Sequence, residues 1–368
     1  MKKITSIFFI IFCIFCFWKV GESNYEKQKE IKKNIVNHPE FLPTKTYALS
    51  TSFGFKNQKA DYYWLQTIQY IGGNAVSSEY KKYLFEMIDL ITELNPYFSQ
   101  PYITGELLLP SYNPRYEDLT EQEQENLKLQ AKDIGLKGLK NFCDLEKIDL
   151  IGKEDNLEKL FSEKKYQNPC KEAEIVYNLA FIYYFYLKDY KNAVKYYKVA
   201  SVTKGSPAGA KNLISILEGK GGNREKAFLM FLNMADYTGK NDEICTEFSK
   251  TLKNFGNDIF SRKVALNGKV LSFLDSERKK YFSENNNGFE ASNCSNFINK
   301  SIRELNIYFL DEANKKYFSE NKKFALSPEE LLTAGFIDYI PTDYQKNNDY
   351  GIIYFYNSEI NGFDYKMG

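Results

Sequence analysis

Few residues of this chain have side-chain types that could carry chemistry. His38 is the only histidine among 368 residues, and Pro39 follows it directly. A lone histidine beside a proline indicates a loop residue, and it leaves no second histidine for a nucleophilic triad or a zinc site. The HExxH, P-loop and GxGxxG motifs do not occur. We therefore expect no cofactor and no metal.

Paired carboxylates are the catalytic chemistry that the sequence leaves open. The 48 acidic residues form too many possible pairs to be tested from sequence. A glycan-acting or cell-wall-acting enzyme is therefore kept as an alternative function. The segment GKGGN, residues 219–223, contains glycines and a lysine. It lacks the spacing of a phosphate-binding loop and predicts a turn between two helices.

Four cysteines outside the N-terminal segment could form disulfides. They are Cys143, Cys170, Cys245 and Cys294, and none has CxxC spacing. Four cysteines allow three pairings, among which sequence alone does not choose. Pairing of nearest neighbours would join adjacent helical units, and buried free thiols are the alternative.

The N-terminus predicts a single-pass membrane protein. Lys2 and Lys3 precede an uncharged apolar run over residues 4–18, a pattern typical of a signal anchor with lysines on the cytoplasmic side. The bulk of the chain is then expected to be extracytoplasmic, at the periplasm or cell surface. Cleavage of this segment and lipidation of Cys16 are the alternatives. The net charge of +1 argues against a nucleic-acid partner.

Helical periodicity predicts the elements that position these residues. Residues 1–21 are the expected anchor and 22–58 a stalk, followed by an all-α solenoid of helix pairs over 59–320. A short helix and a β-hairpin are expected over 321–368, where GIIYFY and FDY flank a turn. Ser327 with Pro328 predicts the start of that short helix. Thr120 and Glu123 predict another helix start, as a capping box.

The segment AEIVYNLAFIYYFYLKDYKNAVKYYKVA, which begins at Ala173, resembles a tetratricopeptide repeat. It has that family's alternation of large and small packing residues, with one extra residue in YYFYLKDY. The following helix pair is a weaker copy, and its GKGGNREKAF is similar to the related Sel-like repeat. The run that begins ADYYWLQTIQYIGG at Ala60 and the tail around GIIYFY look like the opening and closing segments of membrane-tethered bacterial repeat proteins. The signature packing positions are Ala180, Tyr183, Ala193, Tyr197, Ala200, Ala227 and Phe231.

By this resemblance, the first helix of each pair would line a groove that binds a protein or peptide. In the best repeat, the groove residues would be Glu174, Tyr177, Phe181, Tyr184 and Phe185. The alternative is that these rings only pack against neighbouring helices. Repeats that clamp a terminal carboxylate use lysine and asparagine where Tyr177 and Phe181 stand, so we expect no such clamp. The resemblance implies an interaction scaffold, for example in an envelope, pilus or secretion assembly. A pilin-like structural subunit is a further alternative.

Overall fold

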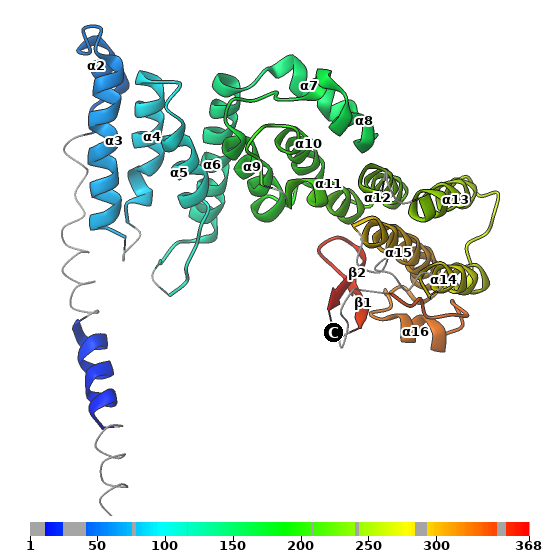
Figure 1. Ribbon diagram of the computed structural model, residues 1–368. Helices are drawn as coiled ribbons and strands as arrows, with labels where there is room; N and C mark the ends of the chain where they lie inside the picture. Colours follow the sequence, from blue (N-terminus) through cyan, green and yellow to red (C-terminus); the bar gives the residue numbers. More distant parts are fainter. Residues whose placement is uncertain are drawn as a thin grey trace, which may run out of the picture. The chain divides into compact units, whose positions relative to one another are not determined.

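The computed structural model describes residues 12–24, 42–75, 79–115, 117–207, 209–239, 243–283, 293–343 and 351–367. Most of these residues are helical, and a two-stranded antiparallel sheet lies near the C-terminus (Figure 1). The predicted all-helical core with a small hairpin is thus confirmed at this level. His38 lies outside the described residues. The chain divides into two compact units, Met1–Phe142 and Cys143–Gly368.

In the first unit, successive helices pack on one another. They are α2 (Lys45–Ser50), α3 (Lys56–Gly73), α4 (Lys81–Leu94), α5 (Ser99–Leu108) and α6 (Glu121–Phe142). Helix α4 contacts α2, α3, α5 and α6. Its Leu90, Ile91 and Leu94 are buried, and they form one core cluster with Ala60 and Tyr63 of α3. The apolar face of α4 therefore organises this unit.

The predicted capping box begins α6 as expected. The backbone N–H of Thr120 donates to Glu123 Oε2 at 2.9 Å, and the backbone N–H of Glu123 donates to Thr120 Oγ1 at 3.3 Å. These bonds satisfy two donors that have no partner within the helix. The hydrogen bonds that the backbone N–H and the hydroxyl of Thr120 donate to the Glu123 carboxylate hold its pKa below its ordinary value.

The predicted N-terminal membrane anchor needs correction. No helix in the described ranges combines the length and the apolar composition that crossing a bilayer requires. The helix over residues 12–24 runs from apolar into polar residues, and within it Lys19 pairs with Glu22 at 3.1 Å. The prediction of a single-pass anchor is therefore wrong for the part of the chain that the structure describes. Residues 4–11 of the expected anchor lie outside the described residues.

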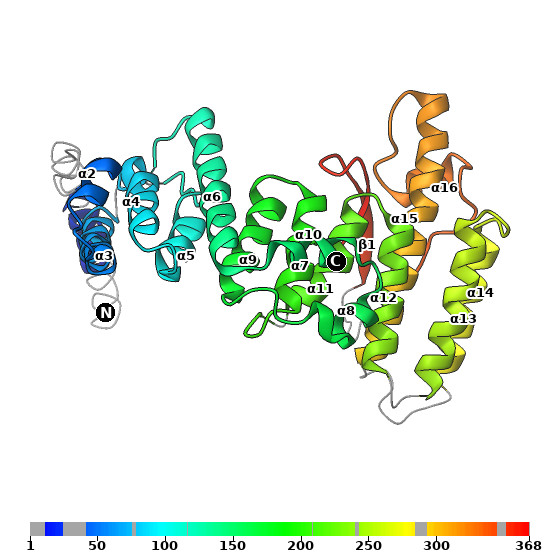
Figure 2. The ribbon, with the colours of Figure 1, turned by 90° about the horizontal axis from the view of Figure 1, so that it is seen from above.

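The second unit contains most of the helices. They are α7 (Leu145–Lys153), α8 (Leu157–Ser162), α9 (Ala173–Phe181), α10 (Tyr190–Ser201), α11 (Gly209–Lys220), α12 (Arg224–Thr238), α13 (Glu243–Phe260), α14 (Gly268–Ser283), α15 (Asn293–Asn321) and α16 (Pro328–Thr333). From α9 to α13 each helix packs on the next, and α15 packs on α12 (Figures 1 and 2). The short helix α16 begins at the predicted cap, where Ser327 accepts the Glu330 backbone N–H.

The hairpin consists of β1 (Ile352–Asn357) and β2 (Gly362–Met367), with Tyr354 opposite Tyr365. Two strands are only marginally stable alone, and here they pack on helices. Phe363 is fully buried, and its backbone N–H donates to Asp311 of α15 at 2.6 Å. On the other strand, the Tyr354 hydroxyl donates to Asp343 at 2.7 Å. The hairpin is thus part of the core of the second unit.

Two disulfides lie in the second unit. They join Cys143 to Cys170 and Cys245 to Cys294, which is the pairing of nearest neighbours along the chain. The first links the residue before α7 to the loop before α9, and the second links α13 to the start of α15. Each bond therefore connects elements that belong to different helix pairs.

Candidate functional site

The five residues predicted to line a groove lie on α9 and the turn of helix after it. Glu174 is exposed and Phe185 is 50% exposed, whereas Tyr177, Phe181 and Tyr184 are half-buried. Tyr177 is partly covered because its ring meets the Tyr197 ring edge-on, with centroids 5.5 Å apart. The rings of Phe181 and Phe185 stack at 5.2 Å. Of the five residues, Phe185 and Glu174 have the most accessible side chains.

The segment YYFYLKDY contains a π-helix. Residues Ile182–Tyr186 (η2) continue α9 with the wider hydrogen-bonding pattern, and the Leu187 N–H donates to the Ile182 carbonyl at 3.1 Å. A π-helix holds one more residue than an α-helical turn in the same length, and such segments are frequent at functional sites. Phe185 lies in this segment, half exposed beside its stacking partner Phe181.

The predicted packing residues lie between the helices. Tyr183 of η2 stacks on Tyr196 of α10 at 5.4 Å, so this ring joins η2 to α10. The alanines are completely buried, which allows the helix backbones to approach closely. The buried packing residues are Ala180, Tyr183, Ala193, Tyr197, Ala200, Ala227 and Phe231. They are therefore core residues and are not available to a partner.

A cleft of about 730 Å³, here called the first cleft, lies beside the turns of these helix pairs. It is bounded by α7, the α9–α10 turn, α10 and the α11–α12 turn. Asp189 positions one wall by capping α10, where it accepts the Asn192 N–H at 3.0 Å. The predicted GKGGN turn forms another wall and reverses direction at Gly222, whose φ is +88°. Only glycine adopts such an angle without cost.

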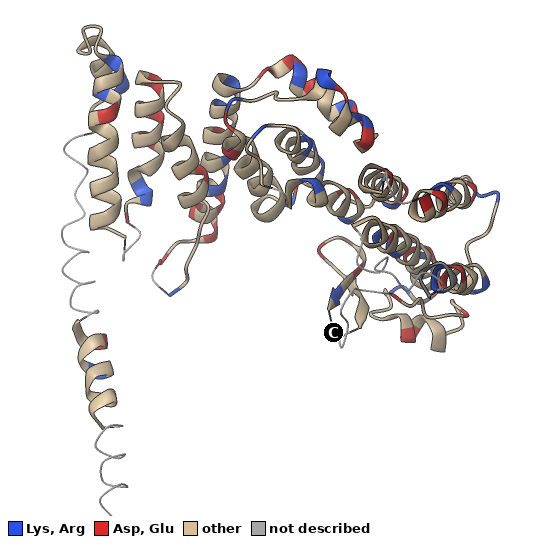
Figure 3. Ribbon diagram, viewed as in Figure 1, with Lys and Arg blue, Asp and Glu red and all other residues tan. Residues whose placement is uncertain are grey.

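A second cleft, of about 740 Å³, adjoins the first. It lies among the α7–α8 connection, α12, α13 and α15. Glu218, Asn223 and Lys226 line both clefts. Figure 3 shows basic and acidic residues interspersed along these helices. The two clefts therefore adjoin at one polar junction.

A buried lysine holds the floor of the first cleft. Lys198 is 1% exposed, and its Nζ donates to the Glu154 carbonyl at 2.8 Å and to Asp155 Oδ1 at 2.9 Å. It thereby ties α10 to the C-terminal end of α7, where a cation is favourable. Burial lowers the pKa of Lys198. Burial raises the pKa of the Asp155 carboxyl, but hydrogen bonds from Lys226 and Lys198 hold that pKa below its ordinary value.

An arginine holds the floor of the second cleft. Arg224 is almost fully buried, and its Nη1 donates to Glu304 Oε2 at 3.1 Å while its Nη2 donates to the Phe363 carbonyl at 2.8 Å. Its Nε lies 3.6 Å from Asp311 Oδ2. Burial raises the pKa of both the Glu304 and the Asp311 carboxyl, and Arg224 opposes this. The cluster therefore joins α12, α15 and β2.

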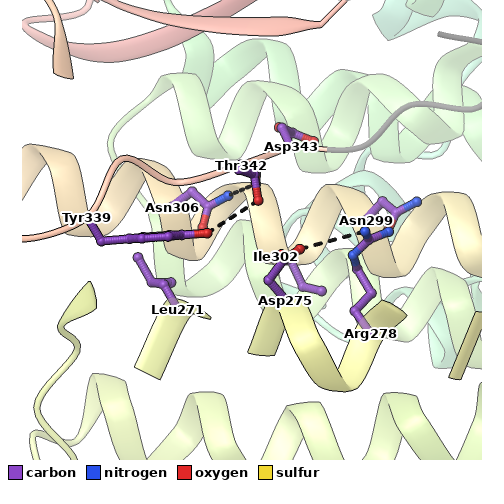
Figure 4. Close-up of a pocket in the computed structure, with 9 residues that line it drawn as sticks. All are labelled: Leu271, Asp275, Arg278, Asn299, Ile302, Asn306, Tyr339, Thr342 and Asp343. Atoms are coloured by element: carbon purple, nitrogen blue, oxygen red, sulfur yellow. Dashed lines mark hydrogen bonds and ion pairs between the residues drawn. The ribbon is translucent and has the colours of Figure 1, made fainter. Parts of the chain in front are cut away.

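A further pocket, between α14, α15 and residues 339–343, has space for about one water molecule, at about 10 Å³ (Figure 4). Arg278 donates to Asn299 Oδ1 at 3.3 Å, and Asn306 donates to the Thr342 carbonyl at 3.0 Å. This pocket is too small for a substrate. Within the described part of the chain, no group of three or more His, Cys, Asp or Glu side chains could hold a metal ion.

No protein-family model, curated protein or solved structure matches this chain. The function is therefore inferred from the two clefts and the aromatic residues beside them.

The clefts were not predicted from the sequence, because their walls come from distant segments. Lys153, Lys191 and Lys253 belong to three different helices or turns, and no spacing along the chain joins them. The available signal was the lysine-rich composition of two turns, LKDYKN and GKGGNREK. Both turns lie on the first cleft.

Proposed function

We propose that this chain is a tetratricopeptide-like scaffold that binds a partner protein through its second unit. The observation that carries the proposal is the pair of adjoining clefts of about 730 and 740 Å³. Sites for small molecules are mostly apolar and enclosed. These clefts are lined largely by charged and amide side chains, which is typical of the polar part of a protein–protein interface.

The aromatic residues beside the first cleft support this proposal. Phe185 is half exposed, and the Lys188 ammonium lies 5.7 Å from the centre of its ring. Lys188 also lines the first cleft, as does Tyr190, whose ring lies 6.2 Å from that of Tyr184. Exposed aromatic side chains next to polar surface are common anchors in interfaces. The stacked pair Phe181 and Phe185 would bind an apolar side chain of the partner.

The resemblance to repeat proteins supports the same function. Helices α9 and α10, and then α11 and α12, are consecutive packed pairs with alanines at their contacts. Stacked helix pairs form extended surfaces that bind proteins in repeat families. We propose that these two pairs act in this way.

We do not propose a carboxylate-based hydrolase. Asp311 lines the second cleft, and burial raises the pKa of its carboxyl. It accepts the Phe363 backbone N–H at 2.6 Å and lies near Arg224. These contacts favour a role in holding the hairpin.

Photo-crosslinking in cells tests the proposed function. A photo-reactive phenylalanine analogue is placed at Phe185 of the full chain, and the control variant carries it at Phe273, which is 58% exposed on α14. Because Phe185 would lie at the interface, we expect it to crosslink reproducibly to one protein through one segment identified by mass spectrometry. No discrete adduct at Phe185, or the same adducts at both positions, would contradict the proposal.

A further inference from the structure

We infer that the two clefts bind an extended acidic segment of the partner protein. This inference rests on the proposed scaffold function and adds the chemistry of the partner. Together the clefts are lined by ten Lys and Arg side chains but six Asp and Glu side chains. The chain as a whole has a net charge of +1. Positive charge is therefore concentrated at this site.

The carboxylates in the clefts are mostly neutralised by neighbours. Asp149 pairs with Lys195 at 2.8 Å. Asp155 pairs with both Lys198 and Lys226 at 2.9 Å. These pairs hold the walls together and leave those carboxylates little capacity to bind a further cation.

Four cations of the clefts have no such partner. Lys153 and Lys191 line the first cleft, and Lys253 and Arg262 line the second. None of them makes an ion pair with any residue that the structure describes. Lys153, Lys191 and Arg262 are exposed, and Lys253 is half-buried. Each cleft thus presents two cations that can bind carboxylates of a ligand.

The amide side chains favour a peptide as the ligand. Asn233 of α12 is 6% exposed and lines the second cleft, yet its side chain makes no hydrogen bond within the described ranges. An asparagine amide can donate and accept at once, so it can pair with a peptide backbone. A peptide group in the second cleft would pair with this amide.

A nucleic acid fits these clefts less well. A nucleic acid carries a phosphate at every nucleotide, and proteins that bind nucleic acids concentrate positive charge without intervening acidic residues. Here Asp189 and Glu225, which form no ion pair with the residues that the structure describes, stand among the lysines. A peptide can place its carboxylates only opposite the four unpaired cations. We therefore assign the clefts to an acidic peptide.

Fluorescence anisotropy with the purified full chain tests this inference. The probe is a labelled peptide of alternating glutamate and alanine, compared with a peptide of alternating glutamine and alanine and with oligothymidylate. We expect the glutamate peptide to bind best, and its affinity to fall as salt is raised. Each double charge reversal, Lys153→Glu with Lys191→Glu or Lys253→Glu with Arg262→Glu, should weaken binding about tenfold.

Matched controls keep the test specific. Lys250→Glu and Lys204→Glu reverse exposed lysines of the same unit outside both clefts, and they should leave affinity within about twofold. Circular dichroism and thermal midpoints of all variants establish that they fold. Equal binding of the glutamine peptide, tighter binding of oligothymidylate, or equal weakening by the control variants would overturn the inference. If the Phe185 crosslink persists in that case, the scaffold function stands and only the acidic partner is excluded.

Discussion

At the scale of single residues, Arg224 contributes to both the core and the candidate site. It contacts Glu304, Asp311 and the Phe363 carbonyl from the floor of the second cleft. A buried ion pair adds little net stability compared with an apolar replacement of both partners, but removal of one partner leaves an uncompensated charge. Glu304 is fully buried, so it has no access to water that could compensate for the loss.

Replacement of Arg224 by leucine should therefore lower the free energy of unfolding strongly. We expect a decrease of about 3–5 kcal/mol, measured by urea denaturation. The control is Glu225→Gln, which changes the exposed neighbouring residue and should alter stability by less than about 0.5 kcal/mol. An effect of Arg224→Leu no larger than that of the control would contradict the role given to this arginine.

At the scale of elements, Asp89 joins three helices of the first unit. It lies on α4 and pairs with Lys45 of α2 and with Lys137 of α6, whose Nζ is 2.7 Å from Asp89 Oδ1. Partial burial raises the pKa of the Asp89 carboxyl, but these hydrogen bonds hold that pKa below its ordinary value of 3.8. Its ionised form is therefore favoured in the folded state.

This linkage predicts a loss of stability in acid. A carboxyl whose pKa is lower in the folded state contributes stability above its ordinary pKa, and this contribution disappears as the pH falls through the folded value. Asp89→Asn should be less stable than the natural chain at neutral pH, by about 1–3 kcal/mol, and the difference should shrink below pH 3.8. Urea denaturation at both pH values measures it.

The matched control is Asp133→Asn on α6, whose carboxyl is 59% exposed. Exposed pairs contribute little, so this variant should follow the natural chain at both pH values. A difference between Asp89→Asn and the natural chain that does not change with pH would show that Asp89 is not the responsible group.

The elements themselves were largely predictable, because their signals are local. The reciprocal bonds of Thr120 and Glu123, the Ser327 cap and the strands on either side of NSEING all occur where the sequence indicated them. Each depends on residues a few positions apart. The N-terminal prediction failed because the apolar run over residues 4–18 is shorter than the roughly twenty residues that a span needs, and the described helix continues beyond it with Lys19 and Glu22.

At the scale of the whole molecule, the disulfides distinguish the two units. Both lie in Cys143–Gly368, and the described cysteines of the first unit, Cys13 and Cys16, are free. A disulfide stabilises mainly by restricting the unfolded chain, more so for longer loops. Sequence separations of 27 and 49 residues correspond to about 3.5 and 4 kcal/mol.

Reduction should therefore destabilise the second unit selectively. We expect faster hydrogen exchange across α9–α15 after treatment with a reductant, and unchanged exchange across α3–α6, as measured by mass spectrometry. The double variant Cys143→Ser with Cys170→Ser should reproduce part of this change without reductant. Equal acceleration in both units would contradict this assignment of stability.

The cations of the two clefts could not be predicted from the sequence. The predicted groove residues could be named from the sequence because they lie within twelve residues of one another, from Glu174 to Phe185. The four unpaired cations extend from Lys153 to Arg262, and they come together only when α7, α10, α12 and α13 have packed. No pattern of neighbouring residues in the sequence predicts that these cations lie close together.

The contact between Arg224 and Phe363 also bears on the synthesis of the chain. These residues are 139 positions apart, and Lys220 and Asp364, which pair at 2.6 Å, are 144 apart. Translation at ordinary rates places roughly 7–30 s between the appearance of α12 and that of β2. During this interval the growing polypeptide has Arg224 without its β2 partner and an incomplete core. Chaperones and proteases would meet the second unit in that state, so its yield in a cell depends on how quickly the hairpin arrives.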